Sequence, residues 1–167
     1  MNIYILRHGI AVEREDWKSK DDSLRPLTRE GKKQLKKISC ALKKLNLEFD
    51  SILSSPYERA KKTAEIVADK LKLKKRLKFS GELKSEGDAE KLICEINRLK
   101  PPPENLLLVG HEPYLSRFIS QLVSGNDEVA MDFKKAGLCK LKVEKLQFGR
   151  CAKFCWLLTP KQMEWMA

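Results

Sequence analysis

The sequence predicts an α/β fold, arranged as a three-layer α/β/α sandwich with a mainly parallel sheet and an antiparallel hairpin at its C-terminal edge. Short apolar runs, typical of buried strands, alternate with longer segments whose apolar residues recur at helical spacing. This alternation of strands and helices favours a parallel sheet covered on both faces. The last stretch instead alternates apolar and polar residues, as a half-exposed hairpin does.

The first half of the chain contains two predicted strands, each followed by a helix. Residues 1–6 form the first apolar run, and Thr28 can cap a helix that continues to about Leu45. Residues 51–54 form the second strand. Ser55-Pro56 then supplies an N-cap residue followed by a proline at the first helical position, so we expect the second helix to begin there.

The second half continues the alternation before its character changes. A third short strand covers residues 77–79, Asp88 begins another helix, and the prolines at 101–103 end it. Residues 106–109 form the fourth strand, which is followed by a helix over residues 114–123. The hairpin strands come last, at residues 139–143 and 152–158.

Length and composition are those of a globular protein, and we expect one domain over residues 1–167. Hydrophobic residues make up 42% of the chain, but no apolar run is long enough to span a bilayer. Met1 leads directly into a strand-like segment, so we expect no signal peptide and a cytoplasmic protein. The five cysteines are irregularly spaced, which favours reduced thiols over disulfides or a metal motif.

The charge balance is strongly basic, with 34 Lys and Arg against 23 Asp and Glu. The densest run covers Lys70 to Lys78. A solvated surface is the first interpretation, an acidic protein partner the second, and nucleic acid the third, because few aromatic residues flank the run. Nucleic acid is therefore an unlikely partner, and we expect no membrane association.

The chain contains only two histidines, His8 and His111, and each follows a predicted buried strand. Neither lies on the apolar face of a predicted helix, where a merely packed histidine would be expected. The second strand ends at Ser54, and Arg59 follows in the next helix. Because the carboxyl ends of parallel strands open on one edge of a sheet, we expect these residues to share a site.

The residue types at this edge suit a phosphoryl group. Arg7 and Arg59 can grip phosphate oxygens through paired, charge-assisted hydrogen bonds. A neutral, oriented histidine can act as a nucleophile, and a second histidine can donate to the phosphoryl oxygens. The sequence contains no carboxylate cluster typical of a metal site, so we expect no metal and no cofactor.

Three motifs resemble those of the histidine phosphatase superfamily, which has the phosphoglycerate mutase-like fold. They are Arg7-His8-Gly9, the Ser-Pro-x-x-Arg-Ala-x-x-Thr pattern within residues 54–64, and Gly110-His111. The chain is similar in particular to the short SixA-type branch, the phosphohistidine phosphatases. The likeness to this branch rests on three segments. Residues 7–11 match Arg-His-Gly-x-Ala, residues 25–31 match Arg-Pro-Leu-Thr-x-x-Gly, and residues 82–88 match Glu-Leu-x-x-x-Gly-Asp.

The resemblance implies a role for each matched residue. His8 is the nucleophile that becomes phosphorylated, and Arg7, Arg59 and His111 form the phosphate pocket. The carbonyl of Gly9 orients the His8 ring. Water then hydrolyses the phosphoenzyme, without a metal or a cofactor.

Four further residues are candidates with alternative interpretations. Glu82 is either the proton donor to the leaving group or a surface glutamate. Arg25 either contacts substrate or holds the loop before the Thr28 helix. Ser55 is an N-cap and a neighbour of the phosphate, and Glu112 borders or orients the site.

Three functions remain open at this point. The first is hydrolysis of phosphohistidine in a signalling protein, which could be an acidic phosphohistidine domain. The second is the same chemistry on a small phosphomonoester, such as a sugar phosphate or a nucleotide. The third is a non-catalytic module that binds phosphorylated ligands.

Overall fold

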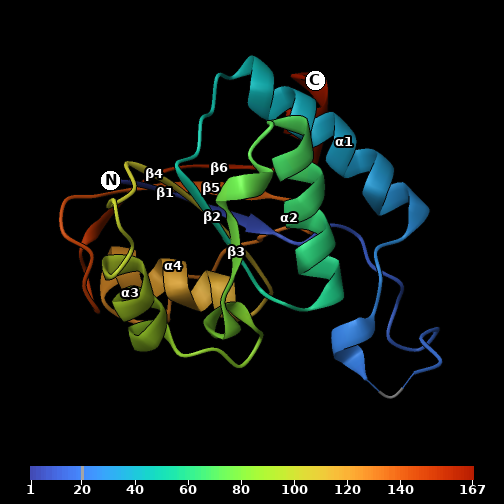
Figure 1. The fold of residues 1–167 in the computed structure, drawn as a ribbon. Helices are drawn as coiled ribbons and strands as arrows, with labels where there is room; N and C mark the ends of the chain where they lie inside the picture. The colour runs from blue at the N-terminus through green and yellow to red at the C-terminus, as the bar shows by residue number, and fades with distance from the viewer. Residues whose placement is uncertain (20) are drawn as a thin grey trace.

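The computed structural model describes residues 1–19 and 21–167 and contains a six-stranded sheet in the order β3-β2-β4-β1-β5-β6 (Figure 1). The first four strands are parallel, and the last two are antiparallel to their neighbours. The strands are β1 (Asn2–Arg7), β2 (Ser51–Ser54), β3 (Leu77–Phe79), β4 (Asn105–Gly110), β5 (Leu138–Val143) and β6 (Ala152–Leu158). The mainly parallel sheet with a C-terminal hairpin at its edge is therefore confirmed.

Helices cover both faces of the sheet, as the sequence predicts (Figure 1). One face carries α1 (Arg29–Lys44), α2 (Glu58–Lys70) and α5 (Pro160–Trp165), and the other carries α3 (Ala89–Asn97) and α4 (Tyr114–Ser124). Each face has its own apolar core, because successive side chains of a strand point to opposite faces. Ile3 and Ile5 enter one core, whereas Tyr4 and Leu6 enter the other.

The central strands bring three chain segments to one edge of the sheet. Arg7 at the end of β1 lies opposite Gly110 at the end of β4, and Ser54 at the end of β2 lies opposite Val109. Backbone hydrogen bonds extend this pairing one residue further, from His8 N–H to Gly110 O at 3.0 Å and from Ser55 N–H to Val109 O at 2.9 Å. The predicted site residues therefore leave the sheet side by side.

The start of α2 differs from the prediction. The helix begins at Glu58, so Pro56 is not its first residue and Ser55 is not its N-cap. The Ser55 hydroxyl instead accepts the Tyr57 N–H at 3.3 Å and contacts the ring of His111. The Ser55 side chain, which local propensity assigns to the helix cap, is therefore used in a tertiary contact with His111. The predicted cap Thr28 is confirmed, and Asp88, predicted to begin a helix, is the N-cap of α3.

Short helical segments were not predicted. They are the 3₁₀ turns η1 (Asp22–Leu24), η2 (Lys74–Arg76) and η3 (Gly81–Leu83), together with α5. Each turn is only three residues long, too short for an apolar period to be recognised. Helix α5 does carry a signal, because Thr159 and Gln162 form a capping box with Pro160 at the first helical position.

Within residues 1–19 and 21–167, no helix is both long enough and apolar enough to cross a membrane.

Candidate active site

The two histidines lie together at the carboxyl ends of β1 and β4. Their ring centroids are 5.0 Å apart, and the residues are 5% and 1% exposed. Arg59 is also buried, 3% exposed, although it carries a charge. Such burial is costly unless the polar atoms find partners, so these side chains need a chemical explanation.

His8 is held as an oriented, neutral imidazole. Its Nδ1–H donates to its neighbour's carbonyl, Gly9 O, at 2.7 Å, which leaves the lone pair on Nε2. Burial lowers the pKa of His8 to about 3; the Gly9 hydrogen bond opposes this, and the charges of Arg59 and Arg7 reinforce it. At neutral pH the ring therefore carries the free electron pair that a nucleophile needs.

Gly9 owes its place to close packing. A Cβ atom there would lie 2.7 Å from Leu35 Cδ1, so any larger residue would require the Leu35 side chain to move. Its N–H donates to Thr63 Oγ1 at 3.0 Å, and the Thr63 hydroxyl donates to Arg59 O at 2.7 Å. The motif on α2 thus fixes the carbonyl that orients His8.

His111 presents a donor on the other side of the site. Its Nε2 lies 2.8 Å from Ser55 Oγ. That oxygen also accepts the Tyr57 N–H at 3.3 Å, so we assign its own hydrogen to the bond with Nε2, an assignment that places the proton of a neutral His111 on Nδ1. Burial lowers the pKa of His111 to about 2, and its neighbours His8 and Arg59 act in the same direction. Nδ1 is buried without a partner in the described part of the chain.

The two arginines are held in the same way by distant backbone. Arg7 Nη1 donates to Phe133 O at 2.6 Å, and Arg59 Nη1 donates to Asp22 O at 2.8 Å. In both, Nε is buried with no hydrogen-bond partner among the residues described. Burial lowers the pKa of each guanidinium from a value so high that both groups remain charged.

Three buried donors near His8 have no partner in the described residues: Arg7 Nε, Arg59 Nε and His111 Nδ1. Their side chains come from β1, α2 and the end of β4. A tetrahedral anion has oxygens to accept from all three while its central atom faces Nε2. The arrangement is thus able to bind a phosphoryl group and to deliver a nucleophile to it.

The other predicted residues are tied to the surrounding loops and helices. Glu82 Oε2 accepts the Asp88 N–H at 3.0 Å, and Glu112 accepts the Ser116 N–H at 3.0 Å in the first turn of α4. Arg25 Nη1 donates to Val12 O at 2.7 Å. None of these contacts is to a histidine, so the roles of Glu82, Glu112 and Arg25 stay predictions.

Two residues of the site were missed by sequence reasoning. Asp22 lies 3.0 Å from Arg59 Nη2 and 2.9 Å from Arg25 Nε, measured from its carboxylate oxygens. Tyr57 packs its ring 5.3 Å from that of His111 and 5.4 Å from the Arg59 guanidinium carbon. The only signal for Asp22 is its spacing of three residues from Arg25. Tyr57 lies inside the second motif, at one of its variable positions.

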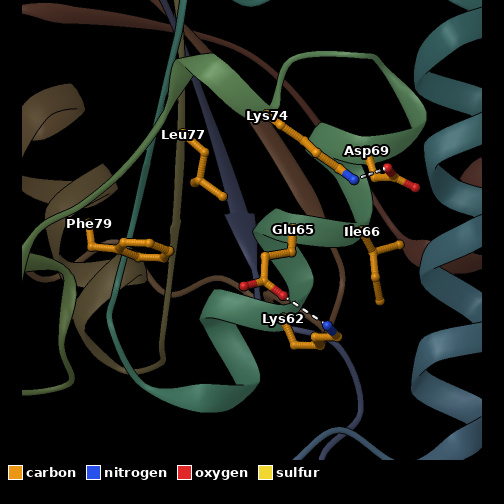
Figure 2. Close-up of a pocket in the computed structure, with 7 residues that line it drawn as sticks. All are labelled: Lys62, Glu65, Ile66, Asp69, Lys74, Leu77 and Phe79. Atoms are coloured by element: carbon orange, nitrogen blue, oxygen red, sulfur yellow. Dashed lines mark hydrogen bonds and ion pairs between the residues drawn. The ribbon is translucent and has the colours of Figure 1, made fainter.

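A well-formed surface pocket elsewhere is not this site (Figure 2). It has a volume of about 540 Å³ and lies between the outer face of α2 and the edge strand β3. Its charged residues pair with one another, Lys62 with Glu65 at 2.9 Å and Lys74 with Asp69 at 2.6 Å. The pocket therefore offers no converging donors to an anion.

The basic run is also remote from the histidines. Lys70 to Lys78 covers the end of α2 and the entry into β3, so it lies at the amino end of that strand. The histidines lie at the carboxyl ends of β1 and β4, the opposite edge of the sheet. The run does not form the rim of the candidate site.

The neutral, buried histidines predict a pH-dependent stability. Their folded-state pKa values lie below the ordinary 6.5, so the unfolded chain binds protons more strongly. The stability they contribute is complete above about pH 6.5 and is lost as the pH falls towards their folded-state values. Urea denaturation between pH 6.5 and 5 should show a loss approaching about 1.4 kcal/mol per pH unit for each histidine. In a His8→Gln variant, the free energy of unfolding should change less steeply with pH than in the wild-type protein. An unchanged pH dependence would contradict the assignment of His8 as a neutral, buried histidine.

Several known proteins are similar to this chain in sequence or in structure. The phosphohistidine phosphatase SixA of Escherichia coli (strain K12) is 27% identical over 161 residues, covering 96% of this chain and 94% of that protein. An uncharacterised protein of Picosynechococcus sp. is 35% identical over 143 residues, 85% of either chain. The structure of the protein histidine phosphatase SixA complexed with tungstate superposes with a TM-score of 0.81 at 26% identity, covering 98% of this chain and 99% of that one.

The fold and the site define a phosphatase of the phosphoglycerate mutase-like class. The model of the histidine phosphatase superfamily (branch 1) matches residues 3–84, which include His8 and Arg59. The chain belongs to the histidine phosphatase superfamily and is of the SixA type.

Proposed function

We propose that this protein is a metal-independent phosphohistidine phosphatase that works through a phosphorylated His8. The observation that carries the proposal is the Nδ1–H bond from His8 to Gly9 O at 2.7 Å, which directs the lone pair of a neutral ring to Nε2. Arg7, Arg59 and His111, all neighbours of His8, each add a buried donor without a partner in the described residues. The SixA relative of Escherichia coli, a phosphohistidine phosphatase by name, supports the choice of substrate.

In the first step, His8 Nε2 attacks the phosphorus atom of the substrate. A bond forms between Nε2 and phosphorus as the bond to the leaving nitrogen breaks, and that nitrogen keeps the electron pair. The two guanidinium groups and His111 Nδ1–H stabilise the charge on the three phosphoryl oxygens. In the second step, water attacks the phosphorus, Nε2 recovers its electron pair, and inorganic phosphate leaves.

The leaving group distinguishes the two candidate substrates. An ester oxygen leaves as an alkoxide unless an acid protonates it, whereas the imidazole of phosphohistidine leaves as a neutral ring once its ring is protonated. Glu82, the predicted proton donor, accepts the Asp88 N–H through one carboxylate oxygen. None of the hydrogen bonds of the described residues joins Glu82 to His8 or His111, so a substrate that needs no acid from the protein is the one we propose.

Replacing Glu82 with glutamine tests this choice. The amide oxygen can still accept the Asp88 N–H, but it cannot supply a proton. If phosphohistidine is the substrate, Glu82→Gln should lower kcat/KM for a phosphohistidine peptide by less than about 3-fold. An ester that depends on acid catalysis should lose about 10²-fold or more. The exposed Glu90→Gln change in α3 is the matched control.

The test of the function itself is a substrate panel with the wild-type protein. A phosphohistidine peptide, a phosphohistidine-bearing protein domain, a sugar phosphate and a nucleotide should be compared by their kcat/KM values. The proposal expects the two phosphohistidine substrates to be preferred by at least about 10²-fold, a difference of roughly 3 kcal/mol in transition-state stabilisation. A preference for the small esters would contradict it. Phosphate binding without any turnover would instead favour a non-catalytic binding module.

A phosphorylated protein remains the proposed partner. The basic run Lys70–Lys78 does not lie where such a partner would bind the active site. It lies at the amino end of β3 and not beside the histidines. Any attraction of this run for an acidic partner therefore acts away from the site of phosphoryl transfer. Recognition at the site itself depends on the arginines and on the loops that hold them.

A further inference from the structure

One half-buried carboxylate lies among three arginines and requires an explanation. Asp22, in the 3₁₀ turn η1, places Oδ2 3.0 Å from Arg59 Nη2 and Oδ1 2.9 Å from Arg25 Nε. The Arg59 side chain is 4% exposed and that of Asp22 is 27% exposed. A third arginine, Arg14, lies 3.7 Å away but is 77% exposed, so its contribution is small.

Asp22 contacts one edge of the Arg59 guanidinium and leaves another free. Its backbone carbonyl accepts from Nη1 at 2.8 Å, and its carboxylate pairs with Nη2 at 3.0 Å. These two contacts take up the end of the planar group. The side edge, made of Nε–H and the second hydrogen of Nη2, is still available, and Nε is buried without a partner in the described chain. Asp22 and a phosphoryl group can therefore bind Arg59 at the same time.

Arg25 holds Asp22 in turn. Arg25 Nε donates to Oδ1 of Asp22 while its Nη1 donates to Val12 O at 2.7 Å. Val12 N–H also donates to Pro26 O at 3.0 Å, which joins the two ends of the loop. The loop is thus fastened at its base, and it carries Asp22 on a fixed support against the buried Arg59.

The charge on Asp22 is maintained. Partial burial raises its pKa, but the guanidinium groups of Arg59 and Arg25 outweigh this effect and hold the pKa of the carboxyl below its usual value. Asp22 is therefore ionised at neutral pH, and its attraction to Arg59 persists throughout the working range of the site.

Resting on the proposed phosphatase site, we propose that Asp22 is a positioning residue that aims the side edge of Arg59 at the phosphoryl group. Arg25 acts one step further away by holding Asp22, and it has no contact with the substrate. The opposite possibility is that Asp22 is an internal anion that competes with phosphate for Arg59. The two ideas predict opposite signs, because removal of a competing negative charge strengthens phosphate binding.

Binding of inorganic phosphate to Asp22→Asn decides between them. Asn keeps the size of the side chain and removes its charge. Positioning predicts that the dissociation constant for phosphate, measured by calorimetry, rises about 10-fold and that kcat falls by a similar factor. The control is Asp16→Asn, an exposed residue of the same loop, which should leave both values unchanged. Tighter or unchanged phosphate binding by a folded Asp22→Asn protein would overturn the proposal.

A second variant shows whether Arg25 acts through Asp22. Arg25→Gln alone should weaken phosphate binding, but the Asp22→Asn/Arg25→Gln double variant should be no weaker than Asp22→Asn. Additive losses would mean that Arg25 contacts phosphate directly. These binding experiments need no turnover, so their outcome is separate from that of the proposed function. A wild-type protein that binds phosphate but hydrolyses no phosphohistidine would refute the function and leave this test intact.

Discussion

A His8→Ala variant is expected to lose hydrolysis of a phosphohistidine peptide almost completely, by at least about 10³-fold in kcat. The change removes the lone pair that the Gly9 carbonyl directs to Nε2. It leaves the donors of Arg7, Arg59 and His111 in place, because each is held by its own distant partner. The loss should therefore appear in kcat, with phosphate affinity largely retained.

Retained phosphate binding is the control for this experiment. A His8→Ala protein that neither binds phosphate nor unfolds cooperatively has lost its structure. In that case the experiment is repeated with the His8→Asn variant, which keeps a polar side chain. A folded His8→Ala protein with wild-type turnover would eliminate His8 as the nucleophile.

The second large effect is expected at Arg59. An Arg59→Ala variant should lose about 10²- to 10³-fold in kcat/KM, because a preorganised donor to the phosphoryl oxygens is removed. Arg59→Lys should recover little of this, since a single ammonium cannot contact Asp22 at one edge and phosphate at the other. The measurement is kcat/KM for the phosphohistidine peptide, followed by phosphate affinity.

Lys61 provides the matched control for Arg59. It lies two residues further along the same helix, and the Lys61→Ala change removes the same charge without touching the site. Its effect on kcat/KM should be below about 2-fold, the size expected for a surface charge. An equal loss in both variants would mean that net charge, and not the placement of one guanidinium group, controls the reaction.

The histidine pair could be predicted because it depends on the hydrophobic pattern alone. The apolar runs before His8 and His111 become β1 and β4, which are neighbours in the sheet. Parallel pairing then brings residues more than a hundred positions apart to one edge. No local preference opposes this arrangement, so pattern and structure agree.

The support of the site could not be predicted in the same way. Asp22 acts through a three-residue turn and a contact with a helix that begins 36 residues later, and neither leaves a periodic signal in the sequence. At Ser55 the local sequence does give a signal, that of a helix N-cap, but in the folded protein the side chain contacts the His111 ring instead. Strand ends can be inferred from sequence, but the side chains that aim the functional groups depend on the folded loops.

Trapping the reaction intermediate tests the central claim most directly. The protein should be mixed with a phosphohistidine peptide labelled in its phosphoryl group, quenched within one turnover in alkali, digested, and mapped by mass spectrometry. The account predicts a phosphoryl group on the peptide that contains His8, resistant to alkali, labile in acid, and absent from the His8→Asn protein. Label on another residue, or product formed in a single turnover with no labelled protein, would contradict it.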